Sequence, residues 1–265
     1  MNQDFIAKHW YAHIYEQQEN HQYDIEFILQ IIQDQIGPAP QNILEVACGG
    51  GRIAIPLARA GHNITGFDAD EYMLMRCYAK AKGLKNLRIF QADAITGQWG
   101  TGYDIVLIAG NFLINIESHD NYALAQETLI ANAARALKPG GYLIIDFDLH
   151  HDPAAIFNRT GRGQGFTGTD DTGTHGCIVG YGSVYNPITC ISTGTNHLEL
   201  TTNNGEQIII PRPWHKHIPS QAQVYAWLTN SGLTIEKAYK NFTTEALPAP
   251  PDETTKRATL LARKG

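Results

Sequence analysis

The sequence has little that would hold a negatively charged polymer: 26 acidic side chains outnumber 20 basic ones, and the formal charge is −6. Proteins that bind a nucleic-acid backbone normally show a surplus or a cluster of basic residues. The polar and aromatic first residues lack the pattern of a signal peptide, and no apolar run reaches the ~20 residues of a membrane span. Four cysteines without a CxxC pair indicate no disulfide scaffold. We therefore expect a cytoplasmic protein with no nucleic-acid and no membrane partner.

What the sequence does contain is a regular alternation of strand and helix patterns. Buried-strand runs occur at 42–47, 63–68, 87–92, 103–109 and 142–147, with helical stretches between them. A later helix begins at Ser220, which forms a capping box with Gln223, and strands at 234–239 and 257–263 follow it. Strands that alternate with helices in this way predict an α/β fold with a mostly parallel sheet.

The alternation breaks after Leu149. The next sixty or so residues are rich in Gly, Thr and Asn, and turns at NPIT and NNGE separate short alternating runs, which predicts antiparallel hairpins. Open α/β sheets bind ligands at the carboxyl ends of their strands, and the insertion leaves the core at such an end, so we interpret it as a substrate lid. The single domain is then divided into a helical N-terminal arm (1–36), a core (37–149), a β-rich insertion (150–217) and a last core part (218–265).

Three acids mark the carboxyl ends of three successive predicted strands. Glu45 lies in the first strand, four residues before Gly49 of a glycine-rich turn; Asp68 ends the second strand, and Asp93 follows the third. A carboxylate in a buried strand is costly unless it has a partner, and a cationic amino group is one. Asp68 could accept both hydroxyls of a ribose, and Asp93 the exocyclic amine of an adenine. The alternative for Glu45 is a solvated acid at a strand end.

These segments resemble a known family. ILEVACGGGRIAIPLARAGHNITGFDADEYML is similar to motifs I and II of class I S-adenosylmethionine-dependent methyltransferases, and RIFQADA, YDIVLIAGNFLINI and ARALKPGGYLIIDF resemble the next three motifs. The resemblance covers residues 40–150 and resumes over 218–265. It implies a doubly wound, mostly parallel seven-stranded sheet with an antiparallel last strand. It also implies S-adenosylmethionine as cofactor and direct SN2 transfer of a methyl group to a small-molecule substrate.

The resemblance also implies a cofactor site. Residues of the first turn would line the methionine moiety, Asp68 would hold the ribose, Asp93 and the Ala94 amide would contact the adenine, and 109–111 would border the sulfonium. Ala47 stands where the family often has glycine, so we expect slight crowding there. GNFL replaces the (N/D)PP(Y/F) motif of enzymes that methylate amino groups of nucleic-acid bases, which argues further against nucleic acid. The full predicted cofactor-binding set is Tyr11, Tyr15, Glu45, Ala47, Gly49, Gly51, Asp68, Ala69, Asp93, Ala94, Ala109, Gly110 and Asn111.

Two aromatic residues of the N-terminal arm belong to this set. Tyr11 and Tyr15 are four residues apart and would share one face of a helix. Related small-molecule methyltransferases have a similar arm that closes over the cofactor carboxylate. One hypothesis is therefore that residues 1–20 are mobile until the cofactor binds. The alternative, packing against the core, stays open.

Six of the eleven histidines lie between 150 and 217, and pairs such as HH and HxH can ligate metal. No DxxxD or HExxH segment accompanies them, so we predict no metal site. A general base is needed only for an acceptor that is protonated at neutral pH. The candidates are His217 first and His215 second. Both lie just before the capped helix, which should hold their backbone in place. Two other functions stay open: a nicotinamide-dependent oxidoreductase, and a non-catalytic protein that binds S-adenosylmethionine.

Overall fold

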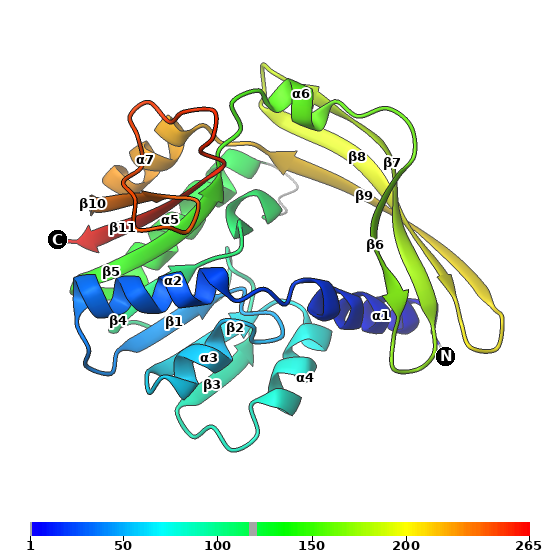
Figure 1. Ribbon diagram of the computed structural model, residues 1–265, viewed down its shortest axis with the longest axis horizontal. Helices are drawn as coiled ribbons and strands as arrows, with labels where there is room; N and C mark the ends of the chain where they lie inside the picture. The colour runs from blue at the N-terminus through cyan, green and yellow to red at the C-terminus, as the bar shows by residue number, and fades with distance from the viewer. Residues whose placement is uncertain (1, 117–120) are drawn as a thin grey trace. The chain divides into compact units, whose positions relative to one another are not determined.

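The computed structural model describes residues 2–116 and 121–265 of the chain, which falls into two units (Figure 1). We call His21–His151 together with Pro219–Gly265 the core unit, and Met1–Asn20 together with Asp152–Ile218 the insertion unit. Within the described ranges, no helix is both long enough and apolar enough to cross a lipid bilayer.

A seven-stranded sheet in the order β10-β11-β5-β4-β1-β2-β3 forms the centre of the core unit. The pairs from β5 to β3 are all parallel, whereas β11 is antiparallel to both β5 and β10. The predicted doubly wound sheet with an antiparallel last strand is therefore confirmed. Its strands are β1 (Asn42–Val46), β2 (Asn63–Asp68), β3 (Leu87–Gln91), β4 (Tyr103–Ile108), β5 (Leu137–Asp148), β10 (Leu233–Lys240) and β11 (Arg257–Lys264).

The central strands are apolar along their length because side chains pack on both faces of the sheet. One buried cluster joins strand residues to Leu129 and Trp227 of two helices, α5 (Tyr122–Ala136) and α7 (Gln221–Asn230). A second cluster contains Ile28 and Leu57, from α2 (Tyr23–Ile31) and α3 (Ala54–Arg59). These two layers hold the strands, and so fix the edge at which their carboxyl ends meet.

Two helix starts are fixed by side-chain caps, and the one at Ser220 confirms a prediction. Asp70 accepts from the Tyr72 backbone N–H at 2.8 Å and begins α4 (Glu71–Lys80). Ser220 and Gln223 form the predicted capping box of α7, with the Gln223 N–H donating to Ser220 Oγ at 3.2 Å. Side-chain caps of this kind contribute about 0.5–2 kcal/mol each.

One helix ends in a π-helical turn, and one strand begins earlier than expected. α2 ends at Ile31 and continues as a π-helical turn over Ile32–Ile36, which closes with the Gly37 N–H donating to the Ile32 carbonyl at 2.9 Å. The fifth strand begins at Leu137 rather than at residue 142, because Leu137 pairs with Tyr103 of β4. The KPGG segment therefore belongs to the strand.

The insertion unit contains a four-stranded antiparallel sheet in the order β6-β7-β8-β9. The hairpin turns fall at 187–190 and 202–206, where NPIT and NNGE predicted them. The short helix α6 (Pro153–Phe157) precedes the sheet and was not predicted. The strands are β6 (Gly163–Thr169), β7 (His175–Asn186), β8 (Ile191–Thr201) and β9 (Gln207–His217).

Helix α1 (Gln3–Gln18) is built into this same unit and lies against β6 (Figure 1). Trp10 has no exposed surface, and its Nε1 donates to the Gly168 carbonyl at 3.1 Å. The Trp10 ring shares a buried cluster with Leu198 and Leu200 of β8. The segment 1–36 is thus divided between the two units, with α1 packed inside the insertion unit. The hypothesis that residues 1–20 are mobile until the cofactor binds stays a prediction.

Candidate functional site

The turn after β1 takes a backbone conformation that favours glycine. Ala47, Gly49 and Gly51 have positive φ angles of 54°, 51° and 78°. A side chain at Gly51 would also lack room, since its Cβ would lie 2.5 Å from Cys77 Sγ. The alanine at position 47 therefore carries a backbone strain of about 1–3 kcal/mol, and the slight crowding expected there stays a prediction.

Glu45, in β1, is 4% exposed, so the alternative of a solvated acid is wrong. Its Oε2 atom is buried and has no hydrogen-bond partner among the described residues. Burial raises the pKa of Glu45 to about 8, and the Arg52 guanidinium opposes this only in part. Arg52 itself makes two hydrogen bonds to Asp24, of 2.8 and 2.6 Å. Glu45 is therefore a buried acid with one acceptor atom left for a cation or a donor.

Asp68 joins the end of β2 to the glycine-rich turn. Its Oδ2 accepts from the Gly49 N–H and its Oδ1 from the Asp70 N–H, both at 2.8 Å. Burial raises the pKa of Asp68, and these two hydrogen bonds partly offset the rise. Each carboxylate oxygen has a second lone pair, so Asp68 can accept further hydrogen bonds from ligand hydroxyls.

Asp93 folds the turn after β3 around one of its oxygens. Oδ1 accepts from the Ile95 N–H at 2.9 Å, the Thr96 N–H at 2.7 Å and Thr96 Oγ1 at 2.9 Å. The hydrogen bond from the Thr96 backbone is the main cause of a lowered pKa at Asp93. We therefore expect the other carboxylate oxygen, Oδ2, to accept the hydrogen bond from an adenine amine.

A cavity of about 250 Å³ opens where β1, β2 and β3 end. Five of the predicted residues line it: Ala47, Asp68, Ala69, Asp93 and Ala94. The lining does not reach the other predicted residues of the core unit, which are Glu45, Gly49, Gly51, Ala109, Gly110 and Asn111. Six further lining residues were missed from the sequence: Phe67, Ala92, Ile95, Phe112, Asn115 and Ile116. Apolar walls around a few acids are typical of a pocket for a nucleoside.

Asp146 of β5 organises the loop after β4, and sequence reasoning missed it. It is 2% exposed and accepts from the Gly110 N–H at 2.9 Å and the Asn111 N–H at 2.8 Å. Both loop residues have positive φ, 72° and 56°. Burial raises the pKa of Asp146 to about 6, although the Arg257 guanidinium lies 3.8 Å away and opposes the rise. The sequence did carry a signal that could have identified Asp146: an acid within the otherwise apolar strand segment YLIIDF.

Tyr11 and Tyr15, which were assigned to the cofactor, make contacts inside the insertion unit. Their ring centroids are 6.1 Å apart on α1. The Tyr15 ring meets Phe166 of β6 edge-on at 5.8 Å, and the Arg212 guanidinium lies 5.3 Å from the Tyr11 ring centroid. These contacts show what holds the two rings in place. That Tyr11 and Tyr15 bind the cofactor stays a prediction.

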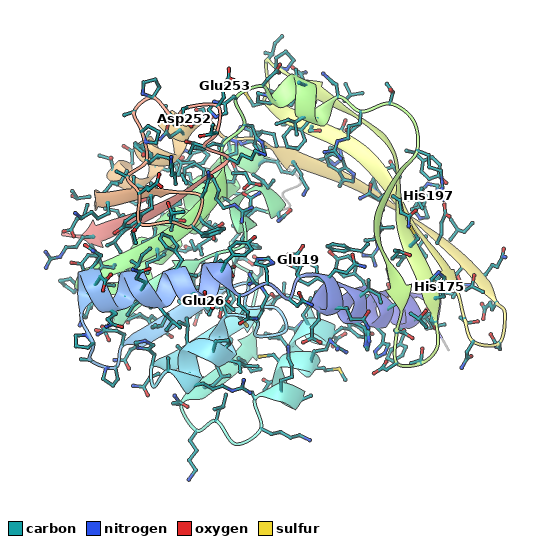
Figure 2. The ribbon with its side chains drawn as sticks, in the orientation of Figure 1. Glu19, Glu26, His175, His197, Asp252 and Glu253 are labelled. Atoms are coloured by element: carbon teal, nitrogen blue, oxygen red, sulfur yellow. The ribbon has the colours of Figure 1, made fainter. Side chains whose placement is uncertain are left out.

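The two candidate bases, His215 and His217, lie at the end of β9. His217 is 5% exposed, and burial lowers its pKa, so the imidazole is neutral at pH 7, the form that a base requires. His215 lies opposite Thr193 of β8. Two other histidines of this sheet, labelled in Figure 2, also have neighbours: His175 Nδ1 is 3.0 Å from Thr169 Oγ1, and the His197 ring is 4.6 Å from that of Tyr181.

Comparison with known proteins points to one chemistry. Residues 43–141 match the family model of a methyltransferase domain. A protein named as a methyltransferase in Geobacillus sp. (strain WCH70) is 27% identical over 231 residues, which cover 84% of this chain and 85% of that protein. The ubiquinone biosynthesis O-methyltransferase of Maricaulis maris (strain MCS10) is 32% identical over 124 residues, 46% of this chain and 42% of that enzyme, so the match spans less than half of its length.

A solved structure has the same fold over nearly the whole chain. It is an S-adenosylmethionine-dependent methyltransferase from Clostridium acetobutylicum ATCC 824, with a TM-score of 0.73 and 17% sequence identity. The match covers 96% of this chain and 98% of that one.

Proposed function

We propose that this chain is a class I S-adenosylmethionine-dependent methyltransferase that methylates a small-molecule acceptor, as its match to the methyltransferase-domain model over residues 43–141 supports. The observation that carries the proposal is the cavity between Asp68 and Asp93, together with the unpartnered buried oxygen of Glu45. S-adenosylmethionine supplies a methyl group bound to a positively charged sulfur. The acids of the site match three parts of this cofactor: its amino group, its ribose and its adenine each have one carboxylate that can accept a hydrogen bond.

In this proposal the core unit binds and orients the cofactor. Glu45 accepts the cationic amino group, Asp68 the ribose hydroxyls, and Asp93 Oδ2 with the Ala94 amide the adenine. Asp146 holds the loop after β4 in the conformation that borders the sulfur. The chain then needs mainly to exclude water and align the acceptor atom with the methyl carbon, and orientation of this kind can supply about 7–11 kcal/mol.

A small acceptor is supported by the charge and by one loop. A net charge of −6 does not favour a polyanionic substrate. GNFL at 110–113 also differs from the motif of enzymes that methylate nucleic-acid bases. The nicotinamide alternative is not favoured, since the methyltransferase model matches 43–141 and β11 is antiparallel. A non-catalytic role is not favoured either.

The insertion is proposed as the part that selects the acceptor. Residues 150–217 form most of a separate unit, as a substrate lid would. Within it, His217 is the first and His215 the second candidate base, needed only where the acceptor is a hydroxyl or an ammonium. Tyr11 and Tyr15 are proposed to contact the cofactor from the same unit. A cytoplasmic location stays a prediction.

Isotopic methyl transfer tests the proposal directly. The protein is incubated with methyl-labelled S-adenosylmethionine and a fractionated metabolite extract, with Asp68→Ala as the matched control. We expect label in a low-molecular-weight fraction with the wild type and much less with the variant. Label only in macromolecules, or none at all, would contradict a small acceptor. A second measurement tests the oxidoreductase alternative: a Tm raised by S-adenosylhomocysteine and unchanged by NAD would contradict it.

A further inference from the structure

We propose that the insertion unit binds a divalent transition-metal cation between helix α1 and the turn that joins β6 to β7. Three side chains meet there: His9 from α1, and Asp170 and Asp171 from the turn. One ligand atom from each lies within 4.8 Å of the others. All three residues belong to the insertion unit, so the site depends on that unit alone.

The donor set and its spacing resemble those of metal ligands. His9 Nε2 is 2.7 Å from Asp171 Oδ1, and His13 Nδ1 is 3.7 Å from the same oxygen. His9 and His13 are four residues apart on α1, a spacing that puts two imidazoles on one helix face. An imidazole with two carboxylates, and a second imidazole nearby, suits zinc or manganese, whereas magnesium and calcium prefer oxygen ligands alone.

The buried carboxylate of Asp170 is an independent sign of a cation. Asp170 is 6% exposed. Its Oδ1 accepts from the Thr172 and Thr174 backbone N–H groups, both at 2.9 Å, and so shapes the turn. Its Oδ2 is buried and has no hydrogen-bond partner in the described part of the chain. A buried carboxylate oxygen is costly unless a charge or a donor compensates it, and a cation would do so.

An ion pair between His9 and Asp171 without a metal would account for fewer of these observations. The contact between His9 and Asp171 could exist without metal, but it would leave Asp170 Oδ2 uncompensated. Tetrahedral zinc ligands at about 2.0–2.2 Å from the ion lie about 3.3–3.6 Å from one another. Donor atoms within 4.8 Å therefore need only a small side-chain adjustment to reach that geometry.

A neighbouring cavity gives the site access to water. It has a volume of about 160 Å³, and its lining includes His9, Thr172 and Thr174. A cation held by the cluster could complete its coordination with water from this cavity. Sequence reasoning overlooked the site because it weighed only the histidines of 150–217, whereas His9 and His13 come from the N-terminal helix.

The test measures binding on the untagged full-length protein. After treatment with a chelator and dialysis, Zn²⁺, Mn²⁺, Mg²⁺ and Ca²⁺ are titrated separately by calorimetry, and bound metal is counted by mass spectrometry. We expect about one Zn²⁺ or Mn²⁺ per chain, with micromolar or tighter affinity, a higher Tm of the loaded protein, and much weaker binding of Mg²⁺ and Ca²⁺.

Variants assign the binding to the cluster. Asp170→Asn keeps an acceptor oxygen for the turn but removes the charge, and His9→Gln removes the imidazole; each should weaken Zn²⁺ affinity at least tenfold. His197→Gln is the matched control, because His197 lies in β8 of the same unit (labelled in Figure 2) and is not one of the three cluster residues; it should bind like the wild type. Circular dichroism verifies folding, and Asp171→Asn replaces any variant that does not fold. No metal bound by the wild type, or equal binding by wild type and cluster variants, overturns the proposal.

Discussion

Glu45 should change its protonation state when the cofactor binds. In the free protein its pKa is about 8, so roughly nine in ten molecules carry a proton on this carboxyl at pH 7. In the proposed complex a cationic amino group faces the carboxylate, and a nearby opposite charge lowers a carboxyl pKa. Binding of S-adenosylhomocysteine at pH 7 should therefore release close to one proton.

The same change predicts how affinity depends on pH. Removing the proton costs about 1.4 kcal/mol at pH 7 and about 2.7 kcal/mol at pH 6, from the difference between pH and pKa. The affinity for S-adenosylhomocysteine should thus rise about tenfold from pH 6 to pH 7, and rise less steeply as the pH passes 8.

Calorimetry in two buffers of different ionisation enthalpy measures the released proton. Glu45→Gln is the control, because its amide does not titrate while the histidines and the ligand still do. We expect the variant to bind more weakly and to lose both the proton release and the tenfold rise. Wild-type binding without proton release, or the same pH slope in Glu45→Gln, would refute the reasoning.

Three further predictions concern other parts of the molecule. Asp68→Ala should weaken S-adenosylhomocysteine binding by about 1.5–3 kcal/mol, tenfold or more, because hydrogen bonds to a charged group are lost; calorimetry showing unchanged affinity would remove the ribose assignment. His217→Ala should lower kcat by about 10²–10⁴ if His217 is the base, with cofactor affinity retained; a wild-type kcat, once an acceptor is known, would leave catalysis to orientation. Trp10→Ala should destabilise the insertion unit by about 3–5 kcal/mol, since the indole is fully buried. Urea unfolding followed by circular dichroism tests this, together with faster proteolysis of α1, and a loss below about 1 kcal/mol would contradict the packing described for α1.

Features that depend on neighbouring residues were predictable from the sequence. The strand runs are apolar because both faces of the sheet are covered, and that pattern is visible in the chain itself. The caps at Asp70 and Ser220 bond to backbone two or three residues away. Likewise, the order of acids after successive strands places Asp68 and Asp93 at one edge, and the structure puts both on one cavity.

Features that depend on distant partners were not predictable in the same way. The indole of Trp10 bonds to a carbonyl 158 residues away, so nothing near Trp10 indicates that α1 belongs with β6. Asp146 binds amides 35 and 36 residues before it, across the pairing of β4 with β5. The cavity wall formed by Phe112 depends on the conformation of the loop before it, where Asn111 has a positive φ.

The division of the chain has a consequence for engineering. The insertion unit is assembled from two segments, Met1–Asn20 and Asp152–Ile218, which are separated by more than half of the core unit's sequence. Transplanting only the second segment into a related scaffold would leave Leu198 and Leu200 without the indole that covers them. Trimming the first segment as a dispensable extension would have the same effect. Any chimera meant to exchange acceptor selectivity should therefore carry both segments together, because they form one structural unit although they are separate in the sequence.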